Sequence, residues 1–380
     1  MGEPQTPSPL IRPADPDFGG AGRGKSKIGT VEIESLRFNM LLCKTGPHVL
    51  AMSIPNDPLN RFWVDASAMN PNLVNDLRPA LVAFLAFDHG RVPRIAGSGF
   101  IIAGNANHAL ILTAKHVLSE GVLNIQQPRP IYATSALFVP ASLRTPNLNP
   151  EKVKVIWMGS ESSGLLNAAH ACYNDTLDIA CCVIAPQELL AAPFAPISIP
   201  VDTRIPSIGD SIQMVSLDGM SVSEIAAPMD HSGFGQKISI ERAVSIRVGT
   251  VTGVYPQGFR QYRWPCFTTS IPAKPGMSGG FVTLPSHGTT MGACGIVCAD
   301  NSTEESHTNY FECGESVIAC AWPALALRVP VSIPSSNNSP TRSLYEMMRM
   351  GDLDLAIGGI DHIEIIDLDN NDCRIGMRPT

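Results

Sequence analysis

The chain has 380 residues, of which 44% are hydrophobic and 16% are charged, and its formal net charge is −7. It is long enough to bury a large core in one domain or two. The acidic balance, without a basic stripe, excludes the usual nucleic-acid binders, and no apolar run is long enough to cross a bilayer. We therefore expect a globular protein with neither a nucleic-acid nor a membrane partner.

The N-terminal part is expected to lie outside the main domain. Residues 1–27 are rich in proline and glycine without hydrophobic periodicity, which predicts a disordered arm. This stretch lacks the apolar run of a secretory signal and carries acidic residues unlike a transit peptide, so we expect a cytoplasmic protein, with the nucleus as the other compartment. Residues 28–77 contain two β-forming runs and then a polar stretch, and they predict a β-rich extension.

From residue 78 to residue 328 short apolar runs alternate with glycine, proline, asparagine and aspartate. This spacing predicts an all-β sandwich or barrel. Polar stretches at 126–135, 143–152 and 160–175 predict surface loops. Several of the ten cysteines lie within apolar runs, so we expect them to remain reduced and buried, and their spacing predicts neither a metal site nor any other cofactor.

Residues 329–380 form a C-terminal tail in which one segment has helical character. In "SPTRSLYEMMRM", Ser339 is a candidate cap, Pro340 fits the first turn, and Leu344, Met347 and Met348 form an apolar stripe that would dock on the barrel. The end of the chain mixes acidic residues with β-formers, so it would either add a strand or fold over the core. Either terminal segment could cover the functional site.

Three polar residues stand next to apolar strands in a suggestive order. His116 follows the strand of "GSGFIIAGNANHALILTAKHVL", Asp178 begins "DIACCVI", and Ser278 lies in "AKPGMSGGFV". A carboxylate at the start of an apolar strand needs a partner. Asp175 is the alternative acid, but its polar turn predicts a solvated side chain. Each residue alone is compatible with a structural role, whereas together they follow the chain order His, Asp, Ser that chymotrypsin-type enzymes use.

With these motifs the segment 78–328 resembles the trypsin-like serine peptidase superfamily, closest to its HtrA-like and glutamyl-endopeptidase branches. The resemblance implies two packed six-stranded antiparallel Greek-key β-barrels, at about 78–190 and 205–328. It also implies that His116, Asp178 and Ser278 form a catalytic triad, and that the N–H groups of Gly276 and Ser278 form the oxyanion hole. The fifty residues after 330 are too few for the PDZ domain that HtrA-like proteases usually carry.

Two departures from the family narrow this interpretation. Met277 stands where the zymogen-activated branch has an aspartate that pairs with a newly freed N-terminus, so the loop must be supported otherwise. The trypsin-type pocket floor would be Pro272, which is not acidic, and the pocket strand offers Val297 and Cys298 in place of a histidine. We therefore expect a small or medium apolar residue on the acyl side of the cleaved bond. Asp300 would either line the pocket mouth and attract a basic side chain or be a solvated strand end.

The leading hypothesis is a serine endopeptidase acting on protein or peptide substrates through an acyl-enzyme. The alternatives are a protease-like binding or scaffolding module with little turnover, and an esterase or other acyl hydrolase with the same triad. An α/β-hydrolase is excluded, because its order is Ser, Asp, His and its serine precedes a helix. Here the serine comes last and strand-like "FVTL" follows it.

Overall fold

A computed structural model gives the three-dimensional structure of the protein. It describes residues 63–87, 93–122, 138–150, 152–159, 163–185, 194–225, 237–260, 262–285, 291–300, 316–330, 340–367 and 372–378. The predicted arm at 1–27 and the two β-forming runs of the predicted extension lie outside these residues.

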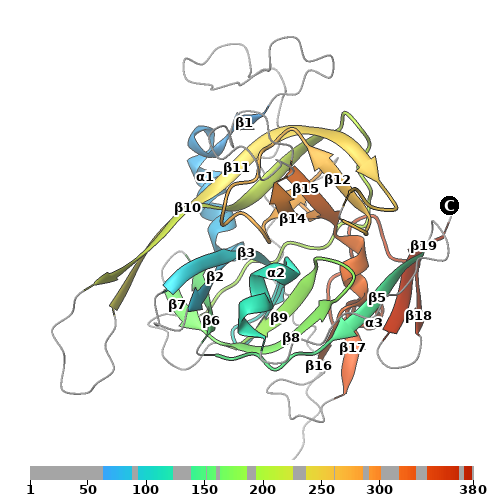
Figure 1. Cartoon of the computed structure of the whole chain (residues 1–380), viewed down its shortest axis with the longest axis horizontal. Helices are drawn as coiled ribbons and strands as arrows, with labels where there is room; N and C mark the ends of the chain where they lie inside the picture. The colour runs from blue at the N-terminus through green and yellow to red at the C-terminus, as the bar shows by residue number, and fades with distance from the viewer. Residues whose placement is uncertain are drawn as a thin grey trace, which may run out of the picture.

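One half of the molecule is a closed antiparallel barrel of six strands. In spatial order these strands are β11 (Lys237–Tyr255), β10 (Ser211–Ile225), β13 (Phe281–Thr283), β14 (Gly295–Asp300), β15 (Ser316–Cys320) and β12 (Cys266–Thr269). Pairing of β12 with β11 closes the barrel, and the short β1 (Val64–Asp65) pairs with β11. The hairpin of β10 and β11 extends beyond the barrel (Figure 1).

The other half is a ten-stranded antiparallel sheet. Its strands follow the order β18 (Ile363–Asp367), β19 (Asp372–Met377), β5 (Phe138–Arg144), β8 (Ala168–Asn174), β9 (Ala180–Ile184), β4 (Ala109–Thr113), β3 (Pro93–Gly104), β2 (Leu81–Phe87), β6 (Val153–Met158) and β7 (Ser163–Leu166). The predicted all-β, chymotrypsin-like architecture is thus confirmed. This sheet has ten strands in place of the predicted six. Two of the additional strands are those of the C-terminal hairpin of β18 and β19, which adds to β5 and thus takes one of the two roles considered for that segment.

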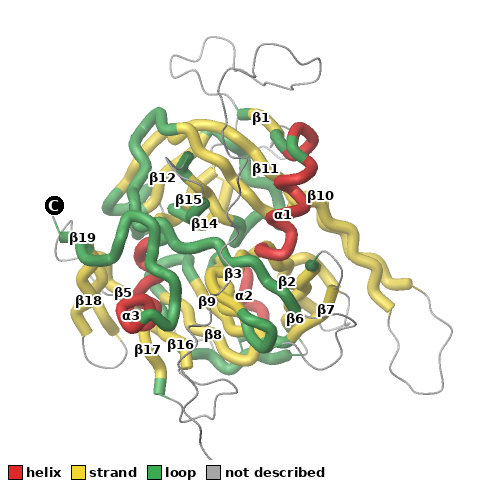
Figure 2. The backbone as a smooth tube through the Cα atoms, turned by 180° about the vertical axis from the view of Figure 1, so that it is seen from behind, coloured by secondary structure: helices red, strands yellow, loops and turns green. Residues whose placement is uncertain are grey.

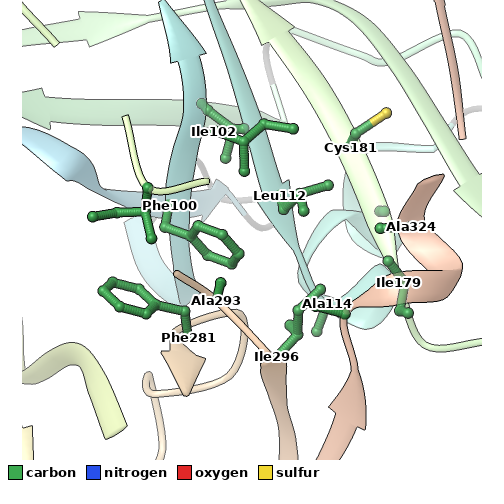
Figure 3. Close-up of a cluster of buried hydrophobic side chains, with 14 of the residues drawn as sticks. Phe100, Ile102, Leu112, Ala114, Ile179, Cys181, Phe281, Ala293, Ile296 and Ala324 are labelled. Carbon is green, nitrogen blue, oxygen red and sulfur yellow. The ribbon is translucent and has the colours of Figure 1, made fainter. Parts of the chain in front are cut away.

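The two halves share a buried core. Phe100 of β3 packs on Phe281 of β13 with 5.2 Å between the ring centroids, and Leu112 of β4 and Ile296 of β14 belong to the same cluster (Figure 3). The connecting segment 194–210 binds both halves: Ile199 N–H donates to a carbonyl of β3 (2.8 Å), and the carbonyl of Pro200 accepts from Ala293 N–H (2.9 Å). Loops run between the halves in the view from behind (Figure 2). Apolar burial therefore fixes how the halves face each other.

Helices are few and short in the described part. α1 (Pro71–Leu77) lies in the polar stretch before β2, where we predicted no helix; Asn70 caps it and Leu73 and Leu77 are buried. The remaining helices are α2 (Lys115–Leu118), α3 (Leu344–Met350) and the 3-10 turns Ser67–Met69, Arg78–Ala80, Ser119–Gly121 and Trp322–Ala326. None of the helices described is long and apolar enough to span a membrane.

Two local predictions need correction. The C-terminal helix starts at Leu344, with Ser343 and Glu346 forming a reciprocal capping box, so Ser339 is not its cap. Residues 341–343 instead form β17 (Thr341–Ser343), which pairs with β16 (Arg328–Pro330). The segment predicted as loop at 160–175 contains β7 and β8, because pairing with neighbouring strands overrides a weakly apolar sequence.

Candidate active site

His116 lies on the single helical turn that follows β4. Every residue of β4 is buried, and the Thr113 hydroxyl donates to the Ser98 carbonyl at 2.7 Å, which fixes the end of the strand. Ala114 is buried in the shared core, and α2 then begins at Lys115. The next side chain, that of His116, is 45% exposed. The buried strand therefore delivers the imidazole to the surface at a fixed place.

Asp178 lies on the turn between β8 and β9 and holds His116 at two points. Its Oδ2 is 2.7 Å from His116 Nδ1, and its Oδ1 accepts from the His116 backbone N–H at 3.0 Å. Leu177 and Ile179 on either side are fully buried, so the turn cannot rotate freely. Since Nδ1 donates to the carboxylate, the other nitrogen of the neutral ring, Nε2, is left as an acceptor.

The environment of His116 acts on its pKa in two directions. Burial lowers the pKa, whereas the hydrogen bond to Asp178 and the negative charge of Asp178 raise it, and the net effect is a pKa above the usual 6.5. The carboxylate thus stabilises the protonated imidazole. A catalytic base needs this stabilisation, because it holds a proton during the reaction.

Ser278 lies on the loop between β12 and β13. Its carbonyl accepts from Ser98 N–H at 2.6 Å, and its Oγ donates to the Cys298 carbonyl at 3.3 Å. Gly279 follows with a φ of 84°, and a Cβ there would lie 2.0 Å from the Ser98 carbonyl oxygen, so only glycine fits. The serine is therefore held against β3 by its backbone.

Shared neighbours bring the three predicted residues into one region. A Cβ on Gly97 would lie 2.6 Å from Val117, next to His116, and 2.8 Å from the Ser278 carbonyl oxygen. Cys298 links the other two, because its carbonyl accepts from Ser278 and its Sγ lies 3.7 Å from the Asp178 carbonyl oxygen. No hydrogen bond joins His116 to Ser278 in the described part of the chain.

The predicted oxyanion-hole groups belong to a sharply turning loop. Gly276 has a φ of 91°, and its carbonyl accepts from the Ser98 hydroxyl at 2.7 Å. Met277 N–H donates to the Lys274 carbonyl, and Gly279 N–H donates to the Val297 carbonyl. Within the described residues, the N–H groups of Gly276 and Ser278 donate to no protein acceptor. Two backbone donors on this loop thus remain available to a ligand.

The predicted pocket residues lie close to this loop. Pro272, Val297 and Cys298 are buried. The backbone of Asp300 ends β14, and its side chain lies outside what the structure describes. The eight described cysteines are free and buried, and among the described residues no cluster of histidine, cysteine and carboxylate side chains could hold a metal ion.

Asp175 corrects one expectation. Its side chain is only 2% exposed, not solvated, and pairs with Lys115 at 3.1 Å and with Arg144 at 2.9 Å. Lys115 precedes His116 in the chain, and Asp175 lies on the turn that leads to Asp178. We name Lys115, Asp175 and Arg144 the first-sheet ion cluster, because they lie on or beside the ten-stranded sheet, most of whose strands precede those of the barrel in the chain. Sequence reasoning missed it because the cluster brings together residues from distant parts of the chain. The signal was that Lys115 and Asp175 lie close in the sequence to His116 and Asp178.

The sequence profile of the trypsin-like peptidase domain matches residues 97–292, about half of the chain and all three predicted residues. The chain belongs to this family. Among solved structures, the chain is similar to the protease Anisep from Arthrobacter nicotinovorans at 16% identity, with a TM-score of 0.34, over 63% of this chain and 90% of that one. No curated protein matches it.

Proposed function

We propose that this protein is a serine endopeptidase in which His116, Asp178 and Ser278 act as a catalytic triad. The observation that carries the proposal is the double contact between Asp178 and His116, 2.7 Å at Nδ1 and 3.0 Å at the backbone N–H. A histidine with a structural role is normally buried. His116 is instead about half exposed, and a carboxylate fixes its tautomer. Family membership supports the same reading.

The mechanism follows from the atoms that this arrangement leaves free. His116 Nε2 takes the proton from Ser278 Oγ as that oxygen bonds to the carbonyl carbon of the substrate. The developing negative charge on the carbonyl oxygen receives hydrogen bonds from Gly276 and Ser278 N–H, each donor being worth about 3–4 kcal/mol. The imidazolium then gives its proton to the leaving amine. Water, deprotonated by His116, hydrolyses the ester to Ser278.

Substrate preference is proposed from the side chains near Ser278. Pro272, Val297 and Cys298 carry no charge that would select a basic or acidic residue, so we infer a small or medium apolar residue on the acyl side of the scissile bond. Asp300 would favour a basic side chain at the mouth if its carboxylate turned inward. Proteins and peptides are the proposed substrates, and no cofactor enters the reaction.

One observation favours the alternative, a binding module with little turnover. Ser278 Oγ donates to the Cys298 carbonyl, and its proton is therefore not directed at His116. Catalytic hydrogen bonds are often long or unformed without substrate, which reconciles this contact with an enzyme. A reaction with the serine itself separates the two possibilities.

The test is labelling of purified protein with a fluorophosphonate probe. We expect wild type to be labelled, Ser278→Ala to stay unlabelled, and Ser207→Ala, a change of the same kind at an exposed loop position, to be labelled like wild type. A peptide library would then read the preferred residue at the cleaved bond. An unlabelled but folded wild type would contradict the endopeptidase and support the binding module.

A further inference from the structure

The loop from Pro272 to Ser278 has no charged side chain at position 277 to support it. It carries the proposed nucleophile and both proposed oxyanion donors. Met277, which stands at the position of the zymogen-type aspartate, is fully buried, and its sulfur accepts from Lys274 N–H at 3.2 Å. An apolar side chain of this kind fills space but forms no ion pair, so any charged support must come from other residues.

Arg247 of β11 supplies a charge directly beneath this loop. Its side chain has no exposure to solvent, yet it carries a guanidinium group. One of its nitrogens, Nη1, donates to the Pro272 carbonyl at 2.8 Å, and the other, Nη2, pairs with Asp218. The ring of Trp63 covers the group at 5.2 Å. A planar group with several donors can make these contacts at once, whereas an ammonium group cannot hold the same fork geometry.

Asp218 lies where the regular pairing of β10 breaks. The register between β10 and β11 shifts after Asp218, and Gly219 follows with a φ of 58°. Such a bulge turns a strand side chain away from its regular direction. The carboxylate therefore reaches Arg247 and also lies 3.4 Å from Lys274 Nζ on the loop.

These contacts join the two strands to the start of the loop. The Arg247 guanidinium donates to the Pro272 carbonyl, and the Asp218 carboxylate attracts the Lys274 ammonium. A buried charge that loses its partner is strongly unfavourable, so the pair resists separation. Beyond this anchor, the turn at 274–277 and the hydrogen bond from the Ser98 hydroxyl to the Gly276 carbonyl also orient this part of the loop.

We propose that the Arg247–Asp218 ion pair positions the loop 272–278, and so aims the N–H groups of Gly276 and Ser278 at the substrate oxygen. The inference rests on the proposed function, because it names the support of the proposed oxyanion hole. Arg247 and Asp218 are positioning residues and touch no reacting atom. The protein would thereby have an active loop without any cleavage to create a new N-terminus.

The test compares four proteins: wild type, Arg247→Lys, Asp218→Asn and the control Asp352→Asn. The control makes the same chemical change as Asp218→Asn in an ion pair with Arg342, at a side chain that is 47% exposed. Arg247→Lys keeps the charge and loses the fork, so it is the variant expected to fold most like wild type. For each protein we would measure the melting temperature, kcat, KM and amide hydrogen exchange in peptides covering 270–284 and, for comparison, β2–β4.

Arg247→Lys and Asp218→Asn should lower kcat by about 10²-fold, as loss of an oxyanion donor does, and change KM by less than about threefold. Exchange should rise at 272–280 and not in β2–β4, and Asp352→Asn should match wild type. Folded variants with wild-type kcat and unchanged exchange would overturn the proposal. If wild type and Ser278→Ala are labelled alike, the endopeptidase proposal fails. Faster exchange at 272–280 in Arg247→Lys and Asp218→Asn would still support the positioning of the loop.

Discussion

The two halves of the site are held in different ways. In the ten-stranded sheet the side chains themselves are fixed, because the Asp178 carboxylate binds both the ring and the backbone of His116. In the barrel the backbone is fixed instead, since Ser98 binds the carbonyls of Gly276 and Ser278. The Ser278 hydroxyl donates to the Cys298 carbonyl at 3.3 Å, a longer hydrogen bond than those that hold His116.

This difference matches what each half would have to do. An imidazole that accepts a proton at Nε2 must keep one tautomer, which requires a partner for its side chain. An oxyanion hole consists of backbone N–H groups, which requires a fixed main chain. Each half has its own buried ions: the first-sheet ion cluster lies beside His116 and Asp178, and Arg247 with Asp218 lies beneath the loop.

The largest effect is expected from breaking the side-chain contact with Asp178→Asn. It should lower kcat by about 10⁴-fold, because the ring loses the partner that sets its tautomer. Asp178 raises the pKa of His116 above 6.5, and the base works only when neutral, so wild-type activity should fall on acidification through a pKa above 6.5. In the variant this acid limb should move to lower pH.

The measurement is kcat/KM as a function of pH, with residual activity followed at high enzyme concentration. Asp352→Asn serves as the control for a surface aspartate. An acid limb that stays in place would show that Asp178 does not govern the titration of His116.

Asp175→Asn should mainly reduce stability. Removing this charge leaves Lys115 and Arg144 without their partner in a largely buried place, which costs about 3 kcal/mol in the free energy of unfolding. The contact between His116 and Asp178 remains, so kcat should fall far less than in Asp178→Asn. Urea unfolding and steady-state kinetics check this. An equal loss of kcat in the two variants would mean that the first-sheet ion cluster controls the catalytic contact.

A smaller effect distinguishes two glycines of the nucleophile loop. Both have positive φ, so alanine adds about 1–2 kcal/mol of backbone strain at either position. A Cβ on Gly279 would also lie 2.0 Å from the Ser98 carbonyl oxygen, whereas a Cβ on Gly276 would meet only the flexible end of Met220 at 3.2 Å and Ile95 at 3.7 Å. We expect Gly279→Ala to lose more stability than Gly276→Ala. Urea midpoints that are equal would contradict the tight approach of the loop to β3.

Much of the fold was predictable from local pattern. The runs that become β2 and β9 are apolar from end to end, and those of β4 and β14 are mostly apolar; all are bounded by turn residues, which is a signal of buried strands. β8 was missed because "AAHACYN" has no such run, and only its pairing with β5 and β9 makes it a strand. The helix α3 was predicted four residues early, since Ser339 and Ser343 both resemble caps and Glu346 selects the second.

For the site, the sequence determined which residues to consider: a histidine after an apolar strand, an aspartate before one and a serine among glycines. Chain order and neighbouring residues suffice for that. Only the tertiary structure decided that Asp178, not Asp175, holds His116, that Asp175 is buried between two cations, and that Arg247 lies beneath the loop. Those outcomes depend on strands distant in the chain that pack against each other, and burial then decides which charges need a partner.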